Sequence, residues 1–134
     1  KDQNIEVVVG PMTGGILLAH ETGKHLETRA IFTERENGAM TFRRGFELKP
    51  GERVLIVEDI VTTGGSVVEV MEVVKAAGGE IVGVGLMVDR SGGKVDFGVP
   101  THALLTLDTP SYEVDECPQC SEGMEITKRG SRKV

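Results

Sequence analysis

The sequence predicts an α/β protein with an open, mostly parallel, twisted sheet and helices on both faces. Apolar segments of strand length alternate along the chain with segments whose apolar residues recur at helical spacing, as expected for strands joined by helical crossovers. The chain has 18 Gly but no Trp, one Tyr and four Phe, which suits buried parallel strands joined by tight turns. Its 134 residues fit one domain with a substantial core.

The first half of the chain predicts a βαβ unit. Its strand, glycine-rich loop, helix and second strand are expected at residues 5–9, 10–15, 16–26 and 29–32. Residues 33–44 are polar, and their Asn37-Gly38 pair is a turn signal, so a mobile loop or a hairpin is expected there, followed by a short strand at residues 46–48. Because Lys1 opens the chain and an apolar strand follows almost at once, we expect that an upstream segment is missing.

The second half predicts a central strand followed by a second crossover. Residues 53–58 contain a continuous apolar run, which is typical of a strand covered on both faces. Residues 66–77 carry apolar side chains at helical spacing and end before Gly78-Gly79, a helix stop signal. Two more strands are expected at residues 81–88 and 103–107. Because strands alternate with helices, parallel pairing should dominate the sheet.

Charge and hydropathy argue against two classes of partner. The formal net charge is −6, which disfavours loose electrostatic binding to nucleic acid or to anionic membranes. No apolar run reaches the roughly 18 residues that span a bilayer, and the chain does not open with a charged segment followed by an apolar signal core. We therefore expect a cytoplasmic protein without nucleic-acid or membrane partners.

The most informative segment follows the expected central strand. Ligands of open α/β sheets bind beyond the carboxyl ends of the strands, and here Glu58 and Asp59 precede residues 62–66 (TTGGS) at a helix start. The glycines let the backbone fold closely around an anion, and the hydroxyls and first helical amides can donate hydrogen bonds to it. The carboxylates suit a different task, which is to accept hydrogen bonds from the vicinal hydroxyls of a ribose.

A phosphate site beside a diol site specifies a ribose 5-phosphate. The alternative is an ordinary strand-to-helix turn with a helix cap, preceded by two solvated acids. Other phosphate motifs fit poorly, since no Lys follows the glycines as in a Walker loop and the acids precede the glycines, unlike those of a dinucleotide fingerprint.

Residues 54–66 (VLIVEDIVTTGGS) resemble the signature with which type I phosphoribosyltransferases bind 5-phosphoribosyl-1-pyrophosphate (PRPP). From residue 5 to about residue 107 the chain also follows that family's order of elements. The resemblance implies a PRPP-using transferase in which Asp59 and Glu58 are catalytic. It assigns PRPP contacts to Glu58, Asp59, Ile60, Val61, Thr62, Thr63, Gly64, Gly65 and Ser66.

Residues 10–16 are similar to the family's pyrophosphate loop, in which the backbone amides of Thr13, Gly14 and Gly15 would face the diphosphate. Many orotate-using members carry a Lys where this chain has Gly14. We therefore expect Mg²⁺ and loop arginines to neutralise the diphosphate instead.

The flexible loop departs most from the family pattern, because its usual basic cluster with a His is replaced by residues 33–44. Arg35, and with it Arg43 and Arg44, are expected to hold the diphosphate, across a homodimer interface as in the family. A solvated, charged hairpin is the alternative.

The base is indicated by Arg90, which follows the strand at residues 81–88 and matches the base-contacting Arg of the orotate-using members. A guanidinium can bind the orotate carboxylate bidentately, whereas purines need no such partner. The resemblance also gives Thr62 a contact with the pyrimidine. It implies that orotate and PRPP form orotidine 5′-monophosphate and pyrophosphate. The alternatives are an Arg90 paired with Asp89 or a neighbouring loop, a purine phosphoribosyltransferase, a non-catalytic PRPP-binding regulator, and a fragment that binds PRPP without turnover.

The expected organisation is a catalytic core at residues 1–110, with its flexible loop at about residues 33–46, and a C-terminal tail at residues 111–134. The tail holds Cys117 and Cys120, spaced as in zinc knuckles and redox motifs. No second cysteine pair is present, so a zinc site would need a partner chain or histidines, and an inert or occasionally oxidised pair is the alternative.

Overall fold

The structure, a computed structural model, describes residues 4–110, 112–113 and 115–124. Its six-stranded sheet has the order β3-β2-β1-β4-β5-β6, and every neighbouring pair is parallel except β2 and β3. The strands are β1 (Val7–Pro11), β2 (Arg29–Glu36), β3 (Ala39–Phe42), β4 (Arg53–Val61), β5 (Glu80–Asp89) and β6 (Thr101–Thr106). The helices are α1 (Gly14–Leu26), α2 (Gly65–Ala76) and α3 (Pro118–Ser121). The predicted open, mostly parallel sheet is confirmed.

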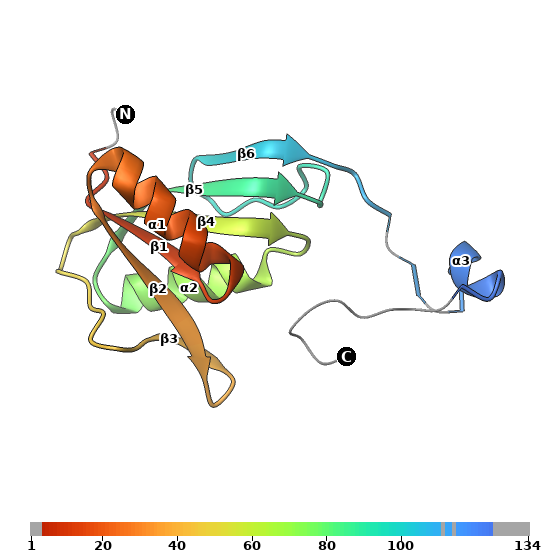
Figure 1. Cartoon of the computed structure of the whole chain (residues 1–134), viewed down its shortest axis with the longest axis horizontal. Helices are drawn as coiled ribbons and strands as arrows, with labels where there is room; N and C mark the ends of the chain where they lie inside the picture. The colour runs from red at the N-terminus through yellow and green to blue at the C-terminus, as the bar shows by residue number, and fades with distance from the viewer. Residues whose placement is uncertain (1–3, 111, 114, 125–134) are drawn as a thin grey trace.

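Helices α1 and α2 cover opposite faces of the sheet (Figure 1). The alternation of strand side chains shows this in β1, where Val8 packs in a cluster with Ala19 of α1, while Val7 and Val9 pack in the larger cluster that contains Val67 of α2. The expectation of helices on both faces is therefore confirmed. No helix in the described ranges is long and apolar enough to cross a bilayer.

The strand order creates a switch point between β1 and β4. From β1 the chain crosses through α1 to β2 on one side, whereas β4 pairs with the other side of β1 and leads through α2 to β5. Connections that leave in opposite directions open a crevice at the carboxyl ends of the two strands, where ligands of such sheets bind.

The region between β2 and β4 was predicted only in part. Residues 37 and 38 form the turn of the β2–β3 hairpin, with φ of 52° at Asn37 and 85° at Gly38, so the hairpin alternative is correct. The expected strand at residues 46–48 is wrong. This segment contributes side chains rather than a ladder: the Phe46 ring packs edge-on against Phe32 at 4.9 Å, and Leu48 is buried in the larger core cluster.

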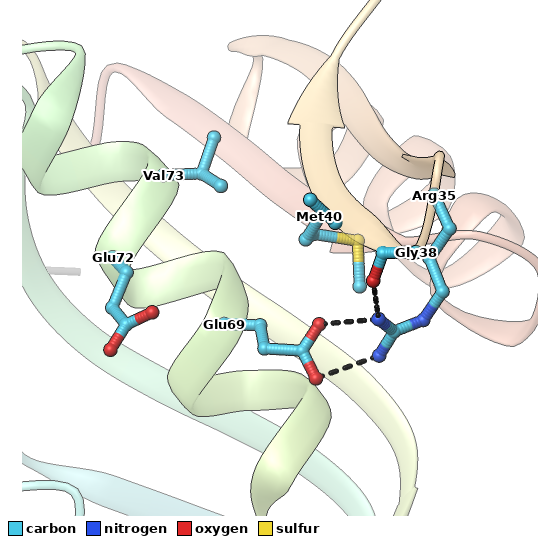
Figure 2. Close-up of a pocket in the computed structure, with 7 residues that line it drawn as sticks. Arg35, Gly38, Met40, Glu69, Glu72 and Val73 are labelled. Carbon is cyan, nitrogen blue, oxygen red and sulfur yellow. Dashed lines mark hydrogen bonds and ion pairs between the residues drawn. The ribbon is translucent and has the colours of Figure 1, made fainter.

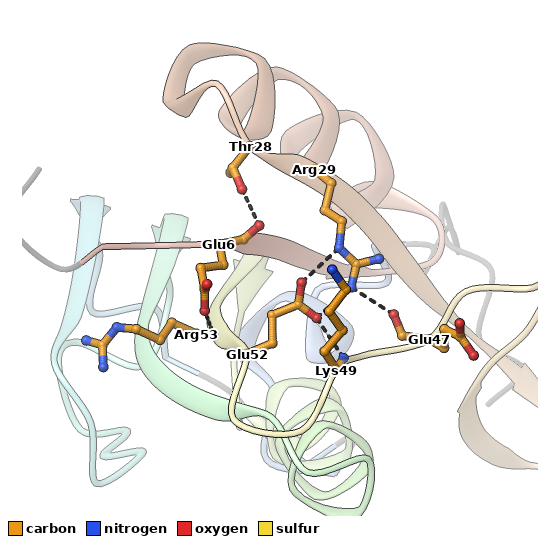
Figure 3. A network of polar contacts seen from close by, with 7 residues as sticks. All are labelled: Glu6, Thr28, Arg29, Glu47, Lys49, Glu52 and Arg53. Carbon is orange, nitrogen blue, oxygen red and sulfur yellow. Dashed lines mark hydrogen bonds and ion pairs between the residues drawn. The ribbon is translucent and has the colours of Figure 1, made fainter.

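A polar network joins the segments at the amino ends of the strands, away from the switch point (Figure 3). The carboxylate of Glu52 accepts hydrogen bonds from Arg29 Nε at 2.9 Å and Nη2 at 2.6 Å, and from the backbone N–H of Lys49 at 2.9 Å. Arg29 Nη2 also donates to the Glu47 carbonyl. Hydrogen bonding by Arg29 lowers the pKa of Glu52 below its ordinary 4.5. The network therefore ties β2 to the turn before β4.

We predict that Glu52→Gln lowers the free energy of unfolding by about 2 kcal/mol at neutral pH, because it leaves the Arg29 guanidinium without its charged partner. A lowered pKa means that the carboxylate stabilises the fold above pH 4.5 and that this contribution disappears as the pH falls below that value. Urea unfolding at several pH values should show the difference between the two proteins shrinking in acid.

Glu80→Gln provides the control. The Glu80 side chain is 59% exposed in its ion pair with Arg53, against 7% for Glu52 with Arg29, so its loss should cost less than about 1 kcal/mol. Equal costs for both variants, or a Glu52→Gln cost that is unchanged below pH 4, would contradict the assignment.

Candidate active site

Two helices begin at the switch point, on opposite faces of the sheet. Helix α1 starts at Gly14, directly after β1, and helix α2 starts at Gly65, directly after β4. Neither helix has a side-chain cap hydrogen bond or an acidic residue in its first turn. First-turn amides and the positive end of the helix dipole attract anions. Because β1 and β4 are adjacent parallel strands, the site presents two such helix ends at one edge of the sheet.

The two glycines at the start of α2 have different roles. Gly64 has a φ of 82°, and a Cβ there would lie 2.8 Å from Val95 and 2.9 Å from the Phe97 ring, so the fold itself requires glycine. At Gly65 a Cβ would meet only Thr63 Oγ1, at 3.9 Å. Apart from this hydroxyl, no protein atom crowds the Cβ position of Gly65, so a ligand could approach the backbone closely there.

The start of α1 packs directly against β4. A Cβ on Gly14 would lie 1.9 Å from Oδ2 of Asp59, closer than any two non-bonded atoms can come. Gly10 and Gly15 allow a similar approach, since a Cβ on Gly10 would lie 2.2 Å from the Gly15 carbonyl oxygen. Glycines at these positions thus bring the pyrophosphate loop predicted from the sequence into contact with the predicted catalytic carboxylate.

The two adjacent carboxylates occupy different environments. Both belong to β4, which continues to Val61 rather than ending at Glu58 as predicted, because Glu58, Ile60 and Val61 remain paired with β5. Successive strand residues point to opposite faces. Asp59 is half-buried beside Gly14, and its Oδ1 accepts a hydrogen bond from the Ile60 N–H at 2.7 Å. Glu58 is buried, with Oε1 accepting from the Asp59 N–H at 3.1 Å.

Arg90 lies across from the end of β4. Its backbone N–H donates to the Val61 carbonyl at 2.8 Å, which places it beside Thr62, the other residue predicted to contact the base. Its side chain is exposed, and no ion pair joins it to another described residue. In particular, the alternative pairing with Asp89 is not formed.

Asp89 instead organises the turn that follows Arg90. One carboxylate oxygen accepts from Ser91 N–H at 2.8 Å and from Ser91 Oγ at 2.6 Å, and the other accepts from Gly93 N–H at 3.1 Å. The hydrogen bond from the Ser91 hydroxyl lowers the pKa of Asp89. Burial acts in the opposite direction and raises the pKa, while the two backbone donors lower it further. This role of Asp89 was not predicted from the sequence, although an Asp followed two residues later by Ser is a known turn signal.

Arg35 points toward Glu69 of α2 (Figure 2). Its Nη1 and Nη2 each lie 2.7 Å from one carboxylate oxygen of Glu69, and Nη1 also donates to the Gly38 carbonyl at 3.0 Å. These groups line a pocket of about 290 Å³ between the hairpin and α2. Its predicted contact with PRPP would require this ion pair to open, so that contact stays a prediction.

The other loop arginines are also paired with acids. Arg44 donates to both oxygens of the buried Glu34, from Nε and from Nη2, each at 3.1 Å. Arg43 Nε lies 3.3 Å from Glu36 and 3.7 Å from Glu34. The segment is therefore a charged hairpin with internal ion pairs, as the alternative from the sequence proposed.

The remaining predicted residues divide between the site and the tail. Thr13, Thr62 and Thr63 border the two helix starts, with Thr62 and Thr63 exposed. Cys117 and Cys120 lie at α3 as free thiols. No group of three or more His, Cys, Asp or Glu side chains in the described ranges is placed to hold a metal ion. The possible zinc site thus finds no third ligand there.

Comparison with known proteins agrees with this geometry. The phosphoribosyl transferase domain family matches residues 1–97. The chain is 57% identical over all 134 residues to orotate phosphoribosyltransferase of Caldicellulosiruptor saccharolyticus, of which it spans 70%.

Two solved structures share the fold. Adenine phosphoribosyltransferase from Rhodothermus marinus superposes with a TM-score of 0.66 at 26% identity, covering 79% of this chain and 72% of that one. Orotate phosphoribosyltransferase from Aeropyrum pernix gives 0.61 at 26% identity, covering 78% and 62%. With two helix starts meeting at the switch point, the chain therefore belongs to the phosphoribosyltransferase family, among the orotate phosphoribosyltransferases.

Proposed function

We propose that the chain transfers the 5-phosphoribosyl group of PRPP to orotate, forming orotidine 5′-monophosphate and releasing pyrophosphate. The observation that carries this proposal is the pair of helix starts without side-chain caps at the switch point, with the Asp59 carboxylate beside the start of α1. PRPP has phosphate groups at both ends of a ribose. Two anion sites with a hydrogen-bond acceptor nearby therefore match its chemistry.

The two ends of PRPP would bind different helices. The 5-phosphate fits the start of α2, where the Gly65 and Ser66 amides and the Thr62 and Thr63 hydroxyls can donate to it and Gly65 leaves the backbone open. The diphosphate fits the loop before α1, at the amides of Thr13, Gly14 and Gly15. The ribose then lies over the end of β4, where its hydroxyls can reach Asp59 and Glu58.

The reaction needs positioning and charge rather than a covalent enzyme intermediate. A ring nitrogen of orotate forms the new bond to the anomeric carbon as the bond to the pyrophosphate oxygen breaks, and the nitrogen loses its proton to solvent. Positive charge develops on the ribose in the transition state. Asp59 lies beside the diphosphate loop, so its carboxylate favours that developing charge. Glu58 supports Asp59 through the hydrogen bond to its backbone N–H.

Mg²⁺ is the proposed cofactor. It usually binds through substrate phosphates, water and one or two carboxylates rather than a full protein cage, and the described residues contain such a carboxylate but no cluster of three metal-ligating side chains. When bound, Mg²⁺ neutralises the diphosphate.

We further propose that the protein forms a homodimer and acts in the cytoplasm. Arg35 is the loop residue proposed to bind the diphosphate, once its ion pair with Glu69 has opened.

Orotate would lie against Thr62 and Arg90. The hydrogen bond between Arg90 N–H and the Val61 carbonyl keeps these two residues adjacent. Because both oxygens of Asp89 are occupied by the following turn, the Arg90 guanidinium remains available for the carboxylate of the base.

The direct test is an assay for orotidine 5′-monophosphate formed from orotate, PRPP and Mg²⁺, with adenine as a competing acceptor. We expect product from orotate and none from adenine. Asp59→Asn should lower kcat by at least about 100-fold without loss of the fold, and Glu72→Gln on the exposed face of α2 should not. A chain that binds PRPP but yields no nucleotide would refute the proposal.

We predict that Arg90→Ala raises the KM for orotate by about 10- to 100-fold, the value of a charge-assisted hydrogen-bonded pair, while the KM for PRPP changes little. Steady-state kinetics with each substrate varied would measure this. Lys94→Ala is the matched control, since Lys94 is an exposed cation nearby that pairs with Asp108. An unchanged orotate KM in Arg90→Ala would exclude Arg90 as the base-recognising residue.

The two glycines before α2 should respond differently to alanine. Gly64→Ala forces a side chain into a positive φ and against Val95 and Phe97, so it should destabilise the fold by at least about 1 kcal/mol. Gly65→Ala should leave unfolding nearly unchanged but raise the KM for PRPP about tenfold or more, because the methyl group enters the phosphate site. If Gly65→Ala left the KM for PRPP unchanged, the 5-phosphate would have to bind at a different place.

A further inference from the structure

The Cys117 and Cys120 thiols are not used by the proposed reaction. Both are free and partly exposed. Cys117 precedes α3 in an extended conformation, Pro118 opens the helix and Cys120 lies within it. At this spacing in a helical turn the two Cα atoms lie about 5 Å apart, which is within the range that a disulfide bridges without backbone movement.

The neighbouring groups make the two thiols unequal. Hydrogen bonding by the Cys120 backbone, followed by that of the Cys120 side chain, lowers the pKa of the Cys117 thiol, whereas the interaction with Cys117 raises the pKa of the Cys120 thiol. Cys117 is therefore the more readily formed thiolate, and Cys120 keeps its proton while Cys117 reacts.

The backbone around the pair is already folded into a turn. The Ser121 N–H donates to the Cys117 carbonyl at 3.0 Å, and the Gly123 N–H donates to the Cys120 carbonyl at 3.0 Å. Gly123 then leaves the helix with a φ of 77°. Bringing the sulfurs together consequently requires side-chain rotation rather than refolding.

Two other uses of the pair fit less well. A structural bridge gains little here, because a disulfide stabilises mainly by closing long loops, and this one would close a loop of only a few residues. A structural zinc ion needs four ligands, and the described part of the chain offers no cluster of three. An accessible pair with one activated thiol is better suited to reversible exchange.

We propose that Cys117 and Cys120 form a redox-active dithiol that exchanges with low-molecular-weight disulfides. The Cys117 thiolate attacks one sulfur of the small disulfide, which releases one small thiolate and leaves a mixed disulfide on Cys117. Cys120 then loses its proton and attacks the Cys117 sulfur, releasing the second small thiolate. The protein dithiol is oxidised to a disulfide while the small disulfide is reduced to two thiols.

The test equilibrates the intact protein with glutathione buffers of increasing oxidised fraction, followed by alkylation and mass spectrometry. We expect both alkylation sites to disappear together and to return on reduction. Cys120→Ser should accumulate a stable mixed disulfide with glutathione. Cys117→Ser should form one roughly tenfold more slowly, and Gln119→Ala, which keeps both thiols and the backbone donors, should behave like the unaltered protein.

The wild-type measurement tests the dithiol even where a variant fails to fold. Independent alkylation of the two cysteines at every glutathione ratio would overturn the proposal, as would equal reactivity of the two serine variants. Stoichiometric zinc that shields both thiols until a chelator removes it would overturn it in favour of a metal site.

Discussion

The contact between Gly14 and the Asp59 carboxylate is the constraint on which the rest of the site depends. Because no atom can occupy the Cβ position of residue 14, the start of α1 lies directly on the end of β4. That approach places the first amides of α1 and a carboxylate at the same point of the switch crevice. Any side chain at position 14 would need Asp59 to move in this backbone. The loop before α1 and the carboxylate are therefore fitted to each other.

Neither helix start at the switch point is capped by a side chain. A helix usually satisfies its first amides with Ser, Thr, Asp or Asn at the cap position. Here the caps are Thr13, whose side chain makes no such bond, and Gly64, which has none to offer. The starts of α1 and α2 therefore lack a side-chain cap, and under the proposed function a bound phosphate would offset the resulting cost to helix stability. The fold tolerates this because the buried valines of β1, β4 and α2 supply its stability.

The sequence predicted the fold where its signals were local and periodic. The apolar run at residues 53–58 became the central strand β4, and the glycine-rich segments became the two helix starts. It failed at residues 46–48, where apolar side chains such as Phe46 and Leu48 pack without backbone pairing, since periodicity reports burial and not hydrogen bonding. The ion pair between Arg35 and Glu69 could not be predicted from the sequence either. That contact joins residues 34 positions apart, and only the tertiary fold brings the hairpin against α2.

The site residues could likewise be named from the sequence, but their contacts depend on the tertiary fold. Sequence could list Asp59, Arg90 and Gly14 as candidates, but it could not show the different surroundings of Glu58 and Asp59. The structure separates them, since adjacent strand residues face opposite sides and only Asp59 meets the loop before α1. The structure also gives Asp89 a supporting role. Its carboxylate accepts hydrogen bonds from Ser91 and Gly93, so that Arg90 is unpaired among the described residues. An arginine next to an acid in sequence thus stays unpaired with it, because the acid binds the turn that follows the arginine.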